Sequence, residues 1–258
     1  MKRDRTAIIT GATSGIGAAF ARLLAQKGYD LFITGRREGK INAFAGELRE
    51  KYGVAVRVSI VELADQDQVD RLIEEVAAIP GVAYLINNAG FGKVGHFIEN
   101  PQRHHAMLMV HVLAAMRLTG AVAPRMVLAG TGAIINVASV AAFFPMPGSA
   151  SYSATKRFLV TFSESLHMEL SSKGIRVQAL CPGMTRTDFH ERMGSDGEKI
   201  RKSYFLGWML PDKVARLSLR HLASGPVLYV PGFVNKLLVR IVSKLPRRLY
   251  YNLTKRIR

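Results

Sequence analysis

The stretch R-T-A-I-I-T-G-A-T-S-G-I-G, residues 5–17, decides the fold of this chain. Its first six residues form a short β-branched run typical of a strand, and a helical pattern follows over residues 18–27. Glycines in the turn between them let the backbone approach a pyrophosphate, and a helix N-terminus offers free N–H groups and a positive dipole end. The stretch therefore predicts a dinucleotide-binding unit, and a tight turn without a ligand stays open as the alternative.

The same alternation of strand and helix continues along the chain. We expect strands at residues 30–34, 54–61, 83–86, 132–137, 175–180 and 227–230, and helices at 38–52, from 65, at 101–126, 152–174, 211–223 and 233–245. This order predicts an α/β fold, a Rossmann-type doubly wound parallel sheet of about seven strands with helices on both faces. We expect a single domain, 1–258, with a dinucleotide-binding and catalytic core at 5–187, a substrate lid region at 188–226 and a basic amphipathic C-terminal tail at 233–258.

Composition places the chain among ordinary globular proteins, with 48% hydrophobic and 21% charged residues. Cys181 is the single cysteine, so no internal disulfide can form, and no signal peptide is recognisable. We therefore expect a cytoplasmic location. Residues 126–155 carry no charge, but Pro145, Pro147 and several glycines argue against a membrane helix and for a buried strand followed by a loop.

Positive charge is concentrated near the C-terminus. From Lys199 onward there are 14 basic residues and one acidic residue, Asp212, so this part holds +13 of the net charge of +17. The distribution argues against a nucleic-acid-binding surface spread over the fold. In residues 233–245, basic residues recur every fourth position opposite an apolar stripe. Such a helix can lie on an anionic membrane surface, or it can pack on the enzyme or on another subunit.

The end of the second predicted strand indicates which dinucleotide binds. A fold that prefers NAD(H) has an acidic residue there for the ribose 2′-hydroxyl, whereas this chain has Gly35-Arg36-Arg37. A guanidinium suits a 2′-phosphate, so we expect NADP(H) and take Arg36 as its ligand. Two solvated arginines at a helix start are the alternative.

Ser139, Tyr152 and Lys156 are the candidate catalytic residues. Tyr152 and Lys156 are four residues apart, so on a helix they share one face. A neighbouring ammonium lowers the pKa of a phenol toward the range in which general acid–base catalysis works. Ser139 follows an apolar run and would be a second donor toward a carbonyl. Alone, the pair could equally be a surface lysine and a half-buried tyrosine.

Three histidines, His104, His105 and His111, lie in the long helical stretch 101–126. Their spacing does not match a zinc signature, and no cysteine or carboxylate lies among them. We predict no metal site.

Five motifs together resemble the short-chain dehydrogenase/reductase family, over roughly residues 5–190. They are Thr10-Gly-x-x-x-Gly15-Ile-Gly17, Asn87-Asn-Ala-Gly90, Ser139, Tyr152-x-x-x-Lys156 and Pro182-Gly-x-Thr-x-Thr187. Within the family the chain looks most like the 3-oxoacyl reductase-like and hydroxysteroid dehydrogenase-like branch.

The resemblance implies a role for each matching residue. Tyr152 would donate a proton to a carbonyl oxygen while the nicotinamide delivers hydride, Lys156 would hold the ribose and lower the pKa of Tyr152, and Ser139 would polarise the carbonyl. The implied cofactor contacts are Gly11, Ser14, Gly15, Ile16, Gly17, Arg36, Glu62, Asn88, Ala89, Gly90, Tyr152, Lys156, Pro182, Gly183, Thr185 and Thr187.

His111 departs from the family pattern, because it stands where an asparagine usually completes the catalytic set. A proton relay through His111 would titrate near neutrality. A core histidine with satisfied hydrogen bonds is the equal alternative.

The resemblance implies an NADPH-dependent oxidoreductase that reduces a ketone to a secondary alcohol, as a homodimer or homotetramer built on the fourth and fifth helices. Large apolar residues in 188–210 favour an apolar small-molecule carbonyl substrate, such as a 3-oxoacyl thioester or a steroid-like ketone. The alternative is that these side chains pack on the core and do not contact a substrate. The alternative is a non-catalytic NADP(H)-binding regulatory or membrane-associated protein.

Overall fold

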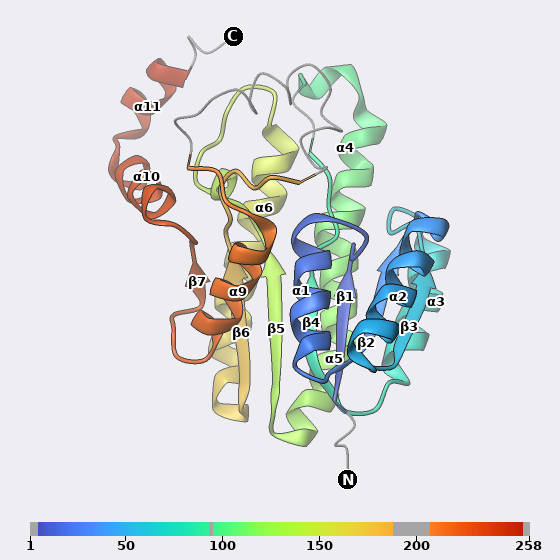
Figure 1. Ribbon diagram of the computed structural model, residues 1–258. Coiled ribbons are helices and arrows are strands. Elements are labelled where there is room, and N and C mark those ends of the chain that lie inside the picture. The colour runs from blue at the N-terminus through green and yellow to red at the C-terminus, as the bar shows by residue number, and fades with distance from the viewer. Residues whose placement is uncertain (1–4, 93–94, 188–206, 255–258) are drawn as a thin grey trace.

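A seven-stranded parallel sheet forms the centre of the computed structural model, which describes residues 5–92, 95–187 and 207–254 (Figure 1). The strand order is β3-β2-β1-β4-β5-β6-β7. The strands are β1 (Thr6–Thr10), β2 (Asp30–Gly35), β3 (Val56–Ile60), β4 (Val82–Asn87), β5 (Gly132–Val137), β6 (Ile175–Leu180) and β7 (Leu228–Tyr229). The predicted doubly wound parallel sheet is confirmed.

Helices cover both faces of this sheet. The helices are α1 (Gly15–Gln26), α2 (Glu38–Tyr52), α3 (Gln66–Ala77), α4 (Pro101–Leu108), α5 (Ala114–Ala129), α6 (Ala150–Leu170) and α9 (Pro211–Leu222), with α10 (Phe233–Lys244) and α11 (Arg247–Thr254) on the flank beside β7 (Figure 1). Successive side chains of β1 point to opposite faces, so Ile9 packs in the core cluster of α1, α2 and α9, while Ile8 packs in that of α3 and α5. One strand therefore contributes to two apolar layers.

The predicted long helix at 101–126 is interrupted by a π-helical turn, Met109–Leu113, and continues to Ala129. By length and composition the stretch Pro101–Ala129 could cross a membrane. However, Leu118, Val122 and Met126 are buried against the sheet, so the core accounts for its apolar character. The uncharged segment 126–155 contains β5 and the loop before α6, as predicted.

The structure refines the sequence prediction for the C-terminal third. Residues 188–206 of the predicted lid region lie outside the described residues. Helix α9 belongs to the core instead of a lid, because Val214, Ala215 and Leu222 are buried in the cluster that contains α1. The predicted helix at 233–245 is present as α10, and a further helix that the sequence analysis did not predict, α11, follows it.

Strand order reverses between β1 and β4, and all carboxyl ends meet at one edge of the sheet. Such a reversal point opens a crevice in which ligands bind. A buried amide chain fixes the neighbouring elements, because Asn87 Nδ2 donates to Asn136 Oδ1 (2.8 Å) and Asn136 Nδ2 donates to Ser163 Oγ of α6 (2.9 Å). The helix that carries Tyr152 and Lys156 is thus tied to β4 and β5.

Candidate active site

A cavity of about 390 Å³ opens at the carboxyl edge of the sheet and joins the glycine-rich turn to the predicted catalytic residues. Most predicted site residues line it: Gly11, Ser14, Gly15, Ile16, Arg36, Glu62, Asn88, Ala89, Gly90, Ser139, Tyr152, Lys156, Pro182, Gly183, Thr185 and Thr187. Gly17 and His111 do not line the cavity but lie behind its wall.

The glycine-rich turn has glycine at positions where a side chain would collide with neighbouring protein atoms. Gly11 and Gly15 adopt φ of 66° and 59°, in the left-handed region. A Cβ at Gly15 would lie 2.8 Å from Thr187 Cγ2, and one at Gly17 would lie 2.4 Å from Asn88 Nδ2. No side chain caps the first turn of α1, so its N–H groups stay available to an anion. The turn therefore fits a pyrophosphate.

Thr10 and Asn88 lock this turn to the end of β4. Asn88 Nδ2 donates to the carbonyl oxygens of Thr10 (2.9 Å) and Gly11 (3.1 Å). Thr10 Oγ1 accepts from the backbone N–H groups of Asn88 and Ala89, both at 3.0 Å. Asn88 thus shapes the turn from behind, and its side chain is held by protein groups.

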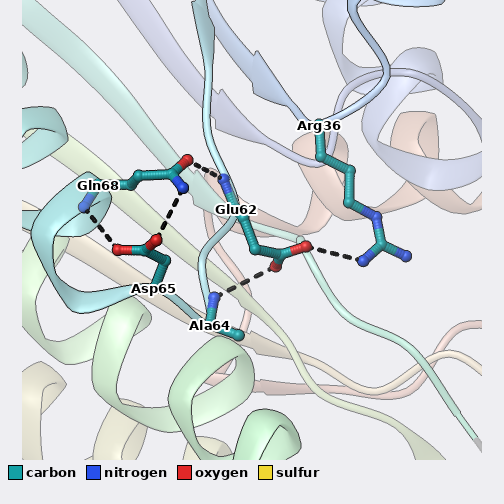
Figure 2. Close-up of polar contacts among 5 residues, drawn as sticks. All are labelled: Arg36, Glu62, Ala64, Asp65 and Gln68. Carbon is teal, nitrogen blue, oxygen red and sulfur yellow. Dashed lines mark hydrogen bonds and ion pairs between the residues drawn. The ribbon is translucent and has the colours of Figure 1, made fainter.

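Arg36 and Glu62 form an ion pair across the ends of β2 and β3, with Arg36 Nη1 2.9 Å from Glu62 Oε2 (Figure 2). The carboxylate also accepts from Ala64 N (3.2 Å), and Glu62 N donates to Gln68 Oε1 (2.9 Å). The two side chains are 59% and 38% exposed, so the pair adds little stability. Its effect is to orient the guanidinium at the cavity mouth.

Arg37 is a wall residue that the sequence analysis did not assign. Its Nη2 donates to Thr13 Oγ1 (2.8 Å) and to Ser14 Oγ (3.3 Å). It therefore links the end of β2 to the glycine-rich turn, and the cavity has two guanidinium groups at this end instead of one. The arginine doublet in the sequence was the signal for it.

Ser139 and Tyr152 face each other across the cavity wall. Ser139 Oγ accepts from Ala141 N (3.1 Å) at the start of the one-turn helix Val140–Ala142. Burial raises the pKa of Tyr152 above 10.0, and its hydrogen bond with Ser139 opposes this rise. The predicted lowering of this pKa by Lys156 is thus wrong for the protein alone, because loss of water around the phenol outweighs the other effects.

Lys156 is buried, and its ammonium is anchored to the sheet. Nζ donates to the carbonyl oxygen of Val137 at 2.8 Å and lies 5.8 Å from the centroid of the Tyr152 ring. Burial lowers the pKa of Lys156 from 10.5 to about 8. The side chain is therefore fixed in place by β5 and reaches the cavity as a group that loses its proton more easily than an exposed lysine.

His111 is buried in the π-helical turn with both ring nitrogens engaged. The N–H of Phe91 can only donate, so Nε2 accepts it (3.0 Å), and in the neutral ring Nδ1–H then donates to Thr155 Oγ1 (3.0 Å). Burial and the charge of Lys156 lower the pKa of His111 well below 6.5. The predicted titration near neutrality is therefore wrong.

The contacts of His111 connect two parts of the site. Thr155 Oγ1 donates to the carbonyl oxygen of Tyr152 (2.9 Å), and Phe91 follows the predicted motif that ends at Gly90. A Cβ at Gly90 would lie 2.9 Å from His111 Nε2, so this approach requires glycine. His111 ties the loop after β4 to the helix that carries Tyr152.

The wall near Ser139 contains further residues that the sequence analysis did not assign, and they are apolar: Val110, Val140, Ala141, Phe144 and Met146. Four of them lie in the uncharged segment between β5 and α6, which was predicted as a loop but not as a substrate wall. Among the described residues, no group of three or more His, Cys, Asp or Glu side chains is placed to hold a metal ion.

Comparison with known proteins gives matches along most of the chain. The family model of the short chain dehydrogenases matches residues 5–198. Sulfoacetaldehyde reductase 2 of Chromohalobacter salexigens is 37% identical over 186 residues, which cover 70% of this chain and 73% of that protein. The very-long-chain 3-oxoacyl-CoA reductase of Homo sapiens is 30% identical over 250 residues, which cover 95% of this chain and 76% of that protein.

A solved structure with the same fold is that of the short-chain dehydrogenase from Sphingobium yanoikuyae in complex with NADPH. It superposes with a TM-score of 0.82 at 32% sequence identity, covering 94% of this chain and 96% of that chain.

The buried charge of Lys156 predicts a pH-dependent stability. Its pKa of about 8 in the folded protein lies below the value of 10.5 for an exposed lysine. The buried ammonium therefore destabilises the folded state fully below about pH 8, and this destabilisation decreases as the pH rises toward 10.5. We expect Lys156→Met to raise the free energy of unfolding at pH 7 by up to about 3 kcal/mol, and this gain to shrink by about 2 kcal/mol at pH 9.5. Urea unfolding of the protein without cofactor measures both.

Lys173→Met is the matched control, since Lys173 is exposed and its loss removes a lysine without removing a buried charge. A gain in the Lys156→Met protein that stays constant between the two pH values would contradict the lowered pKa.

Proposed function

The chain belongs to the short-chain dehydrogenase/reductase family, in its 3-oxoacyl reductase-like branch, and from this premise we propose that it reduces an apolar ketone to a secondary alcohol with NADPH. That it is an oxidoreductase follows from the family. The observation that carries the finer proposal is the single cavity that joins a pyrophosphate-binding turn to Ser139, Tyr152 and Lys156.

The geometry gives each polar side chain of this set a task in ketone reduction. Bound NADPH supplies a hydride to the carbonyl carbon. The Tyr152 hydroxyl donates its proton to the carbonyl oxygen, and its raised pKa keeps that proton in place at neutral pH. Ser139 donates a second hydrogen bond to the same oxygen. Lys156, fixed by Val137, would hold a ribose hydroxyl of the cofactor, and its charge would stabilise the phenolate left on Tyr152.

His111 acts in this proposal as a positioning residue. Both of its ring nitrogens are engaged, by Phe91 and Thr155, and its lowered pKa keeps it neutral. It orients the backbone of Tyr152 through Thr155 and does not relay protons to Lys156.

Two arginines support NADPH over NADH. Arg36 and Arg37 line the mouth of the cavity, and a guanidinium binds a 2′-phosphate through charge-assisted hydrogen bonds. Glu62 holds Arg36 at this position but also competes with a phosphate for it.

The substrate proposed is an apolar ketone, with a 3-oxoacyl thioester as the leading class. The wall beside Ser139 contains Phe144, Met146 and Val140. An extended acyl chain would bury its apolar surface there. The name of the human relative, a very-long-chain 3-oxoacyl-CoA reductase, supports this class, and a steroid-like ketone fits the same chemistry.

The proposal also includes assembly and location. Leu108, Leu113 and Met116 expose apolar side chains along the predicted fourth helix, which spans α4 and α5, and Met168 does so on the predicted fifth helix, α6. These exposed residues support a homodimer or homotetramer formed on the two helices. We place the protein in the cytoplasm, with a peripheral membrane contact through residues 233–258.

Tyr152→Phe tests the chemistry. The substitution removes the proton donor and keeps the ring, so we expect the rate of NADPH oxidation with a water-soluble ketone to fall by about 100-fold or more. Binding of NADPH, measured by calorimetry, should change by less than about twofold, because the ring still fills its place in the wall.

Tyr52→Phe is the control, a hydroxyl removed at the end of α2, away from the cavity. Turnover by Tyr152→Phe at the parent rate would overturn the mechanism.

Arg36→Ala and Glu62→Gln test cofactor choice in opposite directions. Loss of the guanidinium should lower the ratio of NADPH to NADH affinity by about tenfold or more. Glu62→Gln removes the competing carboxylate and should raise that ratio. Arg22→Ala, which breaks an exposed ion pair with Glu47 outside the cavity, is the control. Equal affinity for both dinucleotides in the parent protein would contradict the assignment.

A further inference from the structure

Helix α10 exposes an apolar stripe on the side opposite to its attachment. Asn235 is buried and Val239 packs against a core cluster, so this side is held by the body of the protein. Because successive helical residues are about 100° apart, positions 234, 237, 238 and 241 lie on the outer side. Their side chains are all exposed large hydrophobics, and Phe233 at the helix start is 79% exposed.

Helix α11 follows α10 after Pro246 and also carries exposed apolar residues. Leu249 and Leu253, one turn apart and therefore on one side of the helix, are exposed. Together these exposed residues of α10 and α11 form what we call the C-terminal face. An exposed apolar surface of this kind on two successive helices marks an interaction site.

Basic residues border the C-terminal face: Lys236, Arg240, Lys244, Arg247 and Arg248. Lys236, Arg240 and Lys244 recur every fourth residue, so they form one row beside the apolar stripe. No acidic residue occurs in residues 213–258. An apolar stripe with a cationic border is complementary to the acyl chains and anionic headgroups of a lipid surface.

The C-terminal face lies next to the substrate end of the cavity. Figure 1 shows α10 and α11 on the flank beside β7, extending toward the end of the molecule where the strands terminate. Tyr250 of α11 is buried, and its Oη donates to the carbonyl oxygen of Pro145 (2.9 Å). The neighbours of Pro145, Phe144 and Met146, line the cavity, and Met146 is also exposed.

We propose that the C-terminal face docks on an anionic lipid bilayer and that this docking sets the substrate end of the cavity at the membrane surface. An apolar ketone then passes from the lipid to the wall formed by Phe144 and Met146 without crossing bulk water. Docking deepens the peripheral membrane contact proposed above by naming its surface and its lipid, and the part of the inference that concerns substrate entry rests on the proposed ketone reduction.

A second copy of the chain is a poorer occupant of this face. Each copy has a net charge of +17, and both faces would present the same basic row. Like charges repel across such an interface, whereas an anionic bilayer attracts them.

Co-sedimentation with vesicles of phosphatidylcholine, with or without about one third phosphatidylglycerol, tests docking on the full chain. We expect binding to the anionic vesicles only, weakened by about tenfold or more in 0.5 M NaCl. Leu237→Asp/Ile241→Asp removes the apolar stripe, and Arg240→Glu/Lys244→Glu reverses part of the basic row. Each should reduce binding by about tenfold or more.

Matched controls place the same changes elsewhere on the surface. Leu128→Asp alters an exposed leucine at the end of α5, and Lys27→Glu/Lys173→Glu reverses two exposed lysines. Both should bind like the parent. All variants should reduce a water-soluble ketone at the parent rate without vesicles, which shows that they are folded.

Absence of binding to anionic vesicles, or loss of binding in the controls equal to that in the face variants, would overturn the docking proposal. So would light scattering that shows the face variants changing the oligomeric state, because the occupant would then be a second copy. Absence of turnover in the parent protein with intact vesicle binding would instead overturn the proposed ketone reduction alone.

Tyr250→Phe tests the coupling between docking and substrate entry. It removes the hydrogen bond to Pro145 and leaves the C-terminal face intact. We expect unchanged vesicle binding and an unchanged rate with the water-soluble ketone, but a KM raised several-fold for a long-chain ketone dissolved in the vesicles. An unchanged KM for the vesicle-borne ketone would overturn the coupling.

Discussion

The hydrogen bonds between Thr10 and Asn88 are the interaction on which the site depends. Strands β1 and β4 are neighbours in the sheet but are separated by more than seventy residues of chain, and Thr10 and Asn88 stand at their carboxyl ends. The Asn88 side chain fills the space that Gly17 leaves open, and its amide supports the carbonyl oxygens of Thr10 and Gly11. A larger residue at Gly17 would displace Asn88, so the shape of the pyrophosphate turn and the end of β4 are set together.

Burial sets the pKa values of the titratable side chains around Tyr152. Lys156 and His111 are both buried, and burial lowers the pKa of each, but their partners differ. Lys156 is held by one carbonyl oxygen, so its remaining N–H groups can serve a ligand. His111 uses both ring nitrogens within the protein. His111 therefore holds the loop of Phe91 against α6.

The sequence was sufficient for the order of elements and for most of the cavity wall, because both follow from local patterns. Short apolar, β-branched runs located all seven strands within a few residues. The position of each motif at a strand end placed it at one edge of the sheet. The assignment of α9 to the lid failed because helical periodicity shows that one face of a helix is apolar but not which neighbour covers it.

Electrostatic relations between segments could not be read from spacing. The four-residue interval of Tyr152 and Lys156 put both on one helix face, yet the Lys156 ammonium points to Val137 of β5, nineteen residues earlier in the chain. Likewise, the doublet at 36 and 37 predicted cations at the 2′-phosphate, but only the fold shows that Glu62 from the next strand binds one and that Thr13 and Ser14 bind the other. Because the energy of a charge depends on groups brought together by the sheet, the pKa of each catalytic group is a property of the fold and not of its motif.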